Sequence, residues 1–589
     1  MARPAQSTRY IVALGILLIS ALAGCTQDQE SVPVTAEAPA LAQATRTPLP
    51  LPAEETPTYP QQVTQSALQA IRERGELRAG VLYNDPPFTS LADNGDLQGY
   101  EIDILRRIAE LWNIDVTFVQ VTRQTRIPML ESGEVDLLAG SIPHRRDLGA
   151  YLEFSDPIFR SGYGLLVRAD SAIDGLEDLA ARPVGFISDE ANALLSEQAA
   201  VLGIGLDARP YTSLDEAELA LAGDGDASIP PIIDALVARR ETLMLLASAH
   251  RDLELLAEPL STEYYAFAFR RGDTPLRDAL NLGLQQVAAE GKLSDAFQYN
   301  LYGYPADIFP IYPGQVKYTF ETLPADITGR ESALARIRRG EPLRIAGLDL
   351  SQEPALFDSQ PIIDGYNRAV INEMARRWGS PVTELPDSTG QKAYEMLVSG
   401  QADVAVGLTR ELTYLGDVAF SEPYYQIGLR VIHQNEVALF GIGDLEFKPS
   451  MAAPPLDISE SLIRDNNVFP SIKTAETFEE AYRQLSLFTV WAVVGDEYAL
   501  YLMGQADENL ELIGQRYRPR NRVMAVPSTD ADLLALVNYT LQDMALDGTI
   551  DRLRDQYFRP YVPEDEELAP LDSMQIWPGI STYLGVGGY

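Results

Sequence analysis

The chain repeats itself over a long distance. The segment GYEIDILRRIAELW begins at Gly99, and GYNRAVINEMARRW begins much further along, at Gly365. The aromatic end of the first segment, Trp112, returns as Trp378 at the same interval. Solenoid and propeller repeats have periods of roughly 20–50 residues. A period as long as this one therefore indicates a duplicated domain, so the chain must fold as two copies of one module.

Further pairs of segments recur in the same order, the first three at nearly the same interval. They are ALQAIRERGELR with ALARIRRGEPLR, LESGEVDLLAG with LVSGQADVAVG, FSDPIF with FSEPYY, and EGKLSDAFQYNLYG with DGTIDRLRDQYFRP. These pairs predict a first module over residues 65–305 and a second over 331–562. The proline-containing stretch 306–330 between them is the predicted linker.

Within the first copy, short apolar runs alternate with amphipathic segments. LRAGVLY, VTFVQV and VDLLAGS have the pattern of strands, and YEIDILRRIAELW has apolar residues mostly at helical spacing. Alternation of this kind predicts an open, mostly parallel α/β sheet. Two more apolar runs, 162–170 and 263–271, bracket a second α/β stretch. The module is therefore predicted to have two α/β lobes joined by a two-strand hinge.

The segment 1–25 has the pattern of an export signal. Basic residues precede the apolar run 11–22, which is too short to span a bilayer. The segment LAGC at 22–25 resembles a bacterial lipobox, and Cys25 is the only cysteine in the chain. The alternative is an ordinary signal peptide with a chance cysteine. We favour lipidation of Cys25, because the sole cysteine falls where that motif requires it.

The segments beyond the two modules have a different composition. Residues 26–64 carry seven prolines with many Ala and Thr residues, which predicts a tether of about 35 Å or longer. The last segment, 563–589, begins with an acidic run and is either a docking tail or disordered. We expect the body of the protein to lie outside the cell membrane, held there only by lipid.

Composition excludes several classes of function. The formal net charge is −39, whereas nucleic-acid binding requires a basic footprint. Apolar residues make up 46% of the chain, enough for folded cores. Three histidines and one cysteine make a zinc site or a histidine-activated nucleophile a poor interpretation. We expect neither cofactor nor metal.

The order of motifs PPF, GYEIDI, SGEVDLLAG and FSDP, behind a lipobox, is similar to that of the family 3 extracellular solute-binding proteins. These are the amino-acid-binding components of bacterial ABC importers. The resemblance covers nearly all of 65–305 and, more weakly, 331–562. It implies two tandem modules of the type II periplasmic-binding-protein kind, each closing over a small polar ligand. It also implies an ABC permease as partner.

An amino acid presents a carboxylate, which an arginine fork binds through two hydrogen bonds. In similar proteins this arginine lies seven residues after the glycine that ends DLxxG. The first copy reads GSIPHRRDLGAYLEFS, one residue longer than usual, so Arg145 and Arg146 fall just short of that place. They are either ligand contacts or a solvated pair in a loop. Ser141, next to the glycine, is a further candidate.

The second copy has the usual length at this motif but a different residue in the arginine position. Tyr414 occupies that position, and Arg410 is displaced toward the preceding strand. Thr409 fits the hydroxyl position two residues after the glycine. We therefore take these three residues as candidate ligand contacts of the second copy.

The ligand's ammonium requires a carboxylate, which relatives carry soon after a strand containing Asp-Ala. In the second copy Asp496 fits that place, although an Asp before an apolar run is also a common helix N-cap. In the first copy the alignment puts Pro231 there and Asp234 three residues later. The ammonium-binding role is predicted to be lost or moved in that copy.

The aromatic residues that relatives place around the ligand are also fewer in this chain. Phe88 keeps its place in YNDPPF, but Asp85 stands where relatives have a ring, and Tyr83 could substitute for it. Gln124 occupies the place of a second ring. In the second copy Asp349 lies near the end of a strand facing the expected cleft, or is an ordinary polar cap.

The favoured function is ligand binding for a nutrient importer without catalysis. One alternative is a ligand sensor or a degenerate scaffold of the same fold, although a sensor would need a signalling partner. The other is a cleft enzyme of the dehydratase type, for which no positioned general acid stands out. The sequence leaves open whether both copies bind.

Overall fold

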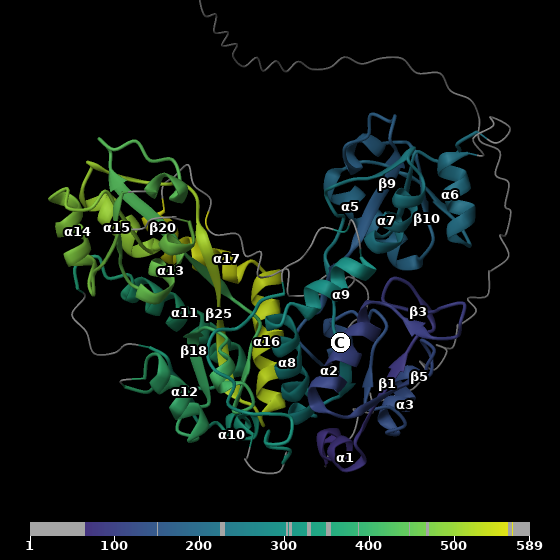
Figure 1. Cartoon of the computed structure of the whole chain (residues 1–589), viewed down its shortest axis with the longest axis horizontal. Coiled ribbons are helices and arrows are strands. Elements are labelled where there is room, and N and C mark those ends of the chain that lie inside the picture. The colour runs from purple at the N-terminus through teal and green to yellow at the C-terminus, as the bar shows by residue number, and fades with distance from the viewer. Residues whose placement is uncertain are drawn as a thin grey trace, which may run out of the picture. The chain divides into compact units, whose positions relative to one another are not determined.

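The computed structural model describes residues 65–562 and Leu568, with short gaps. The gaps are residues 150, 224–229, 302–303, 305–308, 327–331, 349–354, 387, 447 and 467–470. The predicted export segment with Cys25, the predicted tether and nearly all of the C-terminal segment lie outside the described residues. We call the first repeat module 1 (purple to teal in Figure 1) and the second module 2 (green to yellow).

The first lobe of module 1 contains a five-stranded sheet. In spatial order its strands are β5 (Asp115–Gln120), β1 (Glu76–Val81), β6 (Leu137–Leu138), β15 (Ala268–Arg270) and β7 (Leu152–Phe154). β1 is parallel to both β5 and β6, whereas β15 is antiparallel to β6 and β7. Its helices are α1 (Ala67–Arg74), α2 (Tyr100–Trp112), α3 (Arg126–Glu131), α4 (Arg146–Gly149), α8 (Thr274–Ala289) and α9 (Lys292–Asn300). A small sheet of β2 (Asn84–Asp85), β3 (Thr89–Leu91) and β4 (Leu97–Gln98) precedes α2.

The repeated segment that begins at Gly99 is helix α2, as predicted. Most of its apolar residues are buried in the lobe core together with residues of α8 and α9, whereas Leu111 is 38% exposed. Gly99 has φ +131°, and a Cβ there would lie 2.2 Å from the Phe88 carbonyl oxygen. Only glycine allows the chain to pass so close to the preceding turn.

The second lobe of module 1 has its own sheet. The strands, in spatial order, are β11 (Asp207–Pro210), β10 (Pro183–Phe186), β12 (Ala235–Arg239), β9 (Tyr163–Arg168) and β13 (Leu253–Leu255). The helices are α5 (Asp189–Leu202), α6 (Leu214–Ala222) and α7 (Arg240–Ala249), and Ser188 and Ser213 cap the first two. Between the lobes, β8 (Phe159–Ser161) pairs antiparallel with β14 (Glu263–Tyr265). The chain thus crosses between lobes twice, as the sequence predicted.

Module 2 has the same strand order, but its crossings are longer. β20 (Tyr425–Gln434) and β25 (Tyr517–Pro527) each run unbroken from one lobe into the other, so both lobes share one ladder. In spatial order it is β17 (Val382–Glu384), β16 (Leu343–Ala346), β18 (Val404–Leu408), β25, β20, β23 (Ala492–Asp496), β21 (Pro449–Ala452) and β22 (Ser471–Thr474), with β19 (Val418–Phe420) on β25 and β24 (Leu510–Leu512) on β20.

The helices of module 2 follow those of module 1. They are α10 (Ala333–Arg338), α11 (Gln360–Trp378), α12 (Gln391–Val398), α13 (Leu456–Asn466), α14 (Phe478–Ser486), α15 (Glu497–Ala506), α16 (Ala531–Leu546) and α17 (Thr549–Tyr557). Helix α11 contains the second copy of the repeated segment and begins more than a turn earlier than α2 does. Both modules therefore have two α/β lobes joined by two strands.

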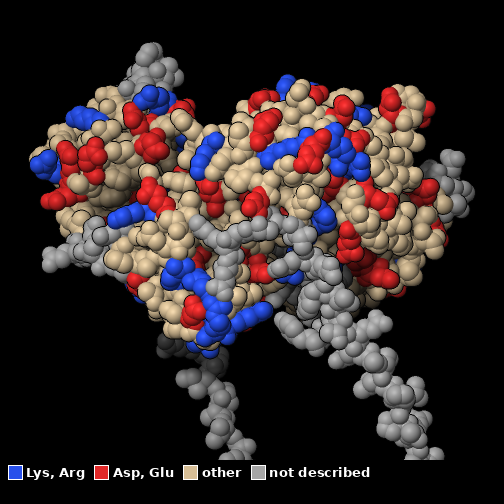
Figure 2. Space-filling view, turned by 90° about the horizontal axis from the view of Figure 1, so that it is seen from below, with Lys and Arg blue, Asp and Glu red and all other residues tan. Residues whose placement is uncertain are grey.

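Within the described part of the chain, no helix has the length and apolarity required to cross a membrane. The same residues contain no group of three or more His, Cys, Asp and Glu side chains that could hold a metal ion. Figure 2 shows acidic and basic side chains interspersed over one face, so the net negative charge is not gathered there into one continuous patch.

Candidate functional site

The strand registers show which residues of the two modules are equivalent. Arg239, the last residue of β12, lies opposite Tyr163, and Asp496, the last residue of β23, lies opposite Leu429. Tyr163 and Leu429 are as far apart in the chain as Gly99 and Gly365, so they are equivalent by the period of the repeat. Module 1 therefore carries a cation where module 2 carries a carboxylate.

This register corrects the alignment made from the sequence, which put Pro231 in the place of Asp496. Pro231 precedes β12, and the strand begins only at Ala235. Two Asp-Ala pairs occur close together in the sequence, and only pairing with β9 decides which one opens the strand. The predicted site residue Asp234 lies at the beginning of β12, where its carboxylate pairs with Arg168 at 3.2 Å. Arg239 is at the other end of that strand.

The second crossing strand also differs in charge between modules. In module 1, Glu263 of β14 lies opposite Ser161. In module 2, Arg520 of β25 lies opposite Ile427, which the period of the repeat makes equivalent to Ser161. Glu263 and Arg520 are thus equivalent, and so, two residues later, are Tyr265 and Arg522. The pair Arg239 and Glu263 of module 1 becomes Asp496 and Arg520 in module 2, with both charges reversed.

We call Ser161, Arg239, Glu241, Glu263 and Tyr265 hinge cluster 1. Arg239 forms an ion pair with Glu263 and donates a hydrogen bond to the Tyr265 hydroxyl at 2.5 Å. The Tyr265 hydroxyl donates to Glu241 at 2.9 Å, and Ser161 donates to the other oxygen of the same carboxylate. Burial raises the pKa of Glu241, because the charged carboxylate loses its hydration there. Each ionisable side chain in the cluster has a partner within it.

Aromatic rings complete hinge cluster 1. The Arg239 guanidinium lies 5.3 Å from the Tyr163 ring centroid and 5.5 Å from that of Tyr265. Such contacts add cation–π attraction to the ion pair. The predicted site residue Phe88 is buried, and its ring meets that of Tyr265 edge-on at 5.2 Å. Tyr83 is partly buried and packs against the core of the first lobe.

A second acidic group in module 1 lies on the first lobe. The buried carboxylate of Glu101 accepts hydrogen bonds from the backbone N–H groups of Gly140 and Ser141. The Ser141 hydroxyl donates to Asp85 at 2.6 Å, which joins two of the predicted site residues. Burial, followed by the negative charge of Asp85, raises the pKa of Glu101 to about 8. This group is therefore largely protonated at neutral pH.

At the equivalent position, module 2 has no acidic residue. Asn367 stands where module 1 has Glu101, and its side-chain oxygen accepts a hydrogen bond from the Tyr424 hydroxyl. That hydroxyl accepts a hydrogen bond from the Gly407 N–H at 2.9 Å. A neutral amide and a phenol thus satisfy the backbone group that a carboxylate satisfies in module 1.

We call Asp496, Arg520 and Arg522 hinge cluster 2. Asp496 is 8% exposed, and its Oδ1 accepts the cap hydrogen bonds of α15 from Tyr498 N–H at 3.1 Å and Ala499 N–H at 3.2 Å. Burial raises its pKa, while these cap bonds, a hydrogen bond from Ser359 and the two arginines act in the opposite direction. The helix-cap role considered for Asp496 is thus present in the structure.

The two arginines of hinge cluster 2 are poorly satisfied. The Nε atoms of Arg520 and Arg522 are buried and have no hydrogen-bond partner among the described residues. Arg522 donates one long hydrogen bond, 3.4 Å, to the Gly407 carbonyl. Burial, followed by the charge of Arg522, lowers the pKa of Arg520 to about 10. This arrangement differs from hinge cluster 1, in which Arg239 has a carboxylate partner.

The remaining candidates of module 2 make contacts within the protein. Tyr414 stacks on Tyr394 with ring centroids 3.8 Å apart, and the Thr409 carbonyl accepts a hydrogen bond from the Tyr394 hydroxyl at 2.5 Å. Arg410 points toward module 1, where it pairs with Asp156 at 3.2 Å. Asp349 lies outside the described residues.

In module 1, Gln124 is exposed in a turn before α3. Arg145 lies just before α4 and lines a cavity of about 130 Å³. Arg146 begins α4, but its side chain is outside the described part of the structure.

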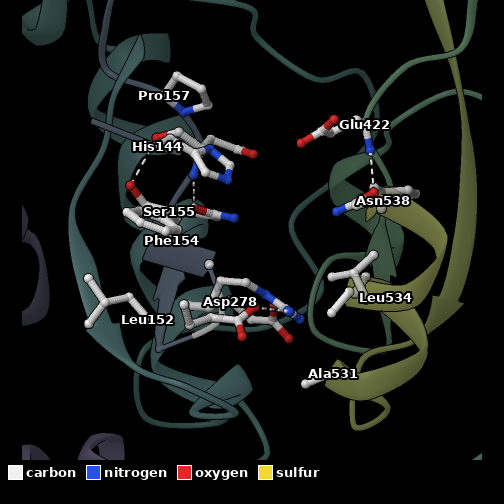
Figure 3. A pocket seen from close by; sticks show the side chains of 18 of the residues that line it. His144, Leu152, Phe154, Ser155, Pro157, Asp278, Glu422, Ala531, Leu534 and Asn538 are labelled. Carbon is white, nitrogen blue, oxygen red and sulfur yellow. Dashed lines mark hydrogen bonds and ion pairs between the residues drawn. The ribbon is translucent and has the colours of Figure 1, made fainter. Parts of the chain in front are cut away.

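That cavity lies between the modules (Figure 3), and none of the residues that line it belongs to either hinge cluster. Equivalent features of both modules line it: the Asp156 N–H donates to Asn281, and the Glu422 N–H donates to Asn538. His144, also in its lining, stacks on Phe154 at 4.5 Å. Burial and the charge of Arg410 lower the pKa of His144 to about 4, so it is neutral at physiological pH. These contacts make the cavity part of the contact region between the modules.

Two lobes of this α/β type joined by two crossing strands define the type II periplasmic-binding-protein fold, and this chain contains two such modules in tandem. The chain belongs to the bacterial extracellular solute-binding proteins, family 3. The family model matches residues 77–300 and again residues 345–560.

Similar proteins include several binding proteins named for amino acids. The "ABC transporter glutamine-binding protein GlnH" of Bacillus subtilis is 26% identical over 243 residues, 40% of this chain and 84% of that protein. The "L-cystine-binding protein TcyJ" of Escherichia coli K12 is 23% identical, over 39% of this chain and 84% of that protein. The "L-glutamate/L-aspartate-binding protein" of Pseudomonas aeruginosa is 25% identical, over 39% and 78%.

Among solved structures, an arginine-binding protein variant from T. maritima is 25% identical, with a TM-score of 0.33 and coverage of 40% of this chain and 99% of that one. The three relatives named above are all described as binding proteins.

Of the charged residues in the hinge clusters, the sequence analysis named only Asp496 as a candidate. It did not name the others, which are Arg239, Glu241, Glu263, Arg520 and Arg522. An available signal was the alternation in PRNR, because residues 520 and 522 must share one face of any strand. Without the partner strand, that face could not be assigned.

Proposed function

We propose that this chain is the ligand-binding component of an ABC importer for a small polar solute of the amino-acid class. The observation that carries the proposal is that the family model matches twice, each time over a two-lobed module with two crossing strands. Binding between lobes and closure about the hinge would present the loaded shape to a permease. The relatives named for glutamine, cystine and glutamate or aspartate support an amino-acid ligand.

The proposal includes attachment at the outer side of a membrane. Cys25 would carry lipid after removal of the residues before it, and residues 26–64 would act as the tether. Detergent phase partitioning of the chain expressed in a bacterium tests this. We expect the unaltered chain in the detergent phase and Cys25→Ser in the aqueous phase; equal partitioning of both would contradict lipid attachment.

Binding is tested with the full mature chain by thermal unfolding in the presence of each common amino acid. A ligand at about one hundred times its Kd adds roughly 2.7 kcal/mol to stability, which shifts an unfolding transition measurably. Isothermal titration of the best candidates then gives stoichiometry. A chain whose unfolding responds to no amino acid would contradict the amino-acid assignment.

A further inference from the structure

The two hinge clusters hold opposite charges at equivalent positions, and they differ in how far those charges are satisfied. In hinge cluster 1, Arg239 is bound by Glu263 and held by two tyrosine rings. In hinge cluster 2, the equivalent charges are Asp496 and Arg520, with a second cation at Arg522. The same place in the fold is thus closed by an internal ion pair in module 1, whereas in module 2 it keeps hydrogen-bond donors that have no acceptor among the described residues.

Hinge cluster 1 offers little to a zwitterionic ligand. An ammonium group placed at the end of β12 would meet the Arg239 cation where module 2 has a carboxylate. A carboxylate placed there would have to displace Glu263, whose side chain is 7% exposed and would then lose its partner. An unpaired buried charge is costly, so the internal pair excludes either group.

Hinge cluster 2, in contrast, could accept a carboxylate, because its arginines are less fully satisfied within the described residues than Arg239 is. The Nε of Arg520 has no hydrogen-bond partner among the residues that the structure describes, and the negative charges that act on its guanidinium are those of Asp496 and Asp457. Both buried Nε atoms, of Arg520 and Arg522, lack acceptors within the described part of the chain. Buried donors without acceptors are rare because desolvation is then uncompensated. Arg520 and Arg522 are two residues apart on one strand, so both side chains lie on the same face of β25.

In module 2, the residues at or near the position of the family's arginine are not available to bind a ligand carboxylate. Tyr414 is stacked on Tyr394, and Arg410 is bound to Asp156 and to the Tyr312 hydroxyl. A ligand carboxylate therefore needs another cation, and β25 supplies two. A guanidinium and a carboxylate match in geometry, since the fork can donate two parallel hydrogen bonds.

We infer that module 2, and not module 1, takes the ligand, and that Arg520 and Arg522 bind its carboxylate. Asp496 ends β23, which is separated from β25 by β20. Its Oδ1 caps α15 and the carboxylate also accepts a hydrogen bond from Ser359; its remaining lone pairs accept the ammonium group of ligands that have one. The ligand class is a small carboxylate, either an amino acid or a carboxylic acid without an amine. This inference rests on the proposed function, because it assumes that the chain binds a small solute.

Isothermal titration of the full mature chain with L-glutamate, L-glutamine and glutarate tests the inference. We expect a single site, and we expect Arg520→Gln to weaken binding by at least about tenfold, as removal of a charge-assisted hydrogen bond does. Arg520→Lys keeps the charge but not the fork and should bind with intermediate affinity. The matched control is Arg483→Gln on α14, an exposed arginine of the same module, which should bind like the unaltered chain.

A second comparison distinguishes ligands that have an ammonium group from carboxylic acids that lack one. Asp496→Asn should weaken glutamate binding by about tenfold or more and leave glutarate binding within about twofold, because glutarate has no ammonium group. Unfolding temperatures of all variants exclude loss of the fold, and Arg522→Gln gives an independent arm if Arg520→Gln is unstable.

Three results would overturn the inference. Unchanged affinity in both Arg520→Gln and Arg522→Gln, with binding otherwise intact, overturns it and leaves the proposed function standing. Loss of binding in Arg239→Gln alone would move the site to module 1. If the unaltered chain binds none of these carboxylates, the inference fails, and the amino-acid screen shows whether the proposed function fails with it.

Discussion

Removing the Arg239 guanidinium should destabilise module 1 strongly, because it leaves two acidic side chains in a buried place without their cation. Arg239 pairs with Glu263, whose side chain is 7% exposed, and its bond to Tyr265 connects it to the buried Glu241. Breaking a buried ion pair from one side costs about 3–5 kcal/mol. Since the Arg239 side chain is 26% exposed, we expect Arg239→Met to cost near the lower end, about 3 kcal/mol.

The double variant Arg239→Met with Glu263→Gln separates this charge effect from lost packing. Its cost should be clearly smaller than that of Arg239→Met alone, because the stranded negative charge is gone. Amide hydrogen exchange of the full chain, measured on peptides covering β9 and β12, reports the opening free energy of this lobe without interference from module 2. A cost below about 1 kcal/mol for Arg239→Met, or strict additivity of the two substitutions, would refute the reasoning.

Single contacts give three further predictions. The raised pKa of Glu101, about 8, means that its stabilising contribution is full below about pH 4.5 and is lost as pH rises through 8; Glu101→Gln should remove a slope of about 1.4 kcal/mol per pH unit from exchange-derived stability over that range. Gly99→Ala should destabilise the first lobe by more than about 2 kcal/mol, because the new Cβ would lie 2.2 Å from a carbonyl oxygen. Urea titration measures this cost and that of the control, Gly95→Ala, which shares a positive φ but has open space around it and should cost about 1 kcal/mol. Arg410→Leu strands the Asp156 carboxylate and should speed limited proteolysis between the modules several-fold; an unchanged rate would show that this ion pair contributes nothing there.

Much of the fold was accessible from the sequence alone. The long period of the repeat, carried by pairs such as Gly99 and Gly365, predicted two modules, and the alternation of strands with amphipathic helices predicted their α/β lobes. Both features are local or periodic, so each can be recognised without knowing which strands pair. The two-strand hinge was also predicted, since the apolar runs 162–170 and 263–271 had to leave and re-enter one lobe.

The candidate site was less accessible, because it depends on register. Asp496 was recognised from a local pattern, but its equivalent in module 1 was sought at Pro231 and is Arg239. The beginning of a strand is decided by the neighbour against which it pairs. Without that neighbour, the two Asp-Ala pairs are equally acceptable starting points in the sequence.

Charge pairing was decided only by the tertiary structure. The sequence by itself predicted the module and its duplication, and it gave the acidic composition directly; it also predicts an export signal. It could not show that Glu263 neutralises Arg239 in one copy, while in the other the Nε of Arg520 has no acceptor among the residues that the structure describes. The physical reason is that the strength of an ion pair depends on distance and burial, and both arise only when strands remote in sequence pair across the hinge.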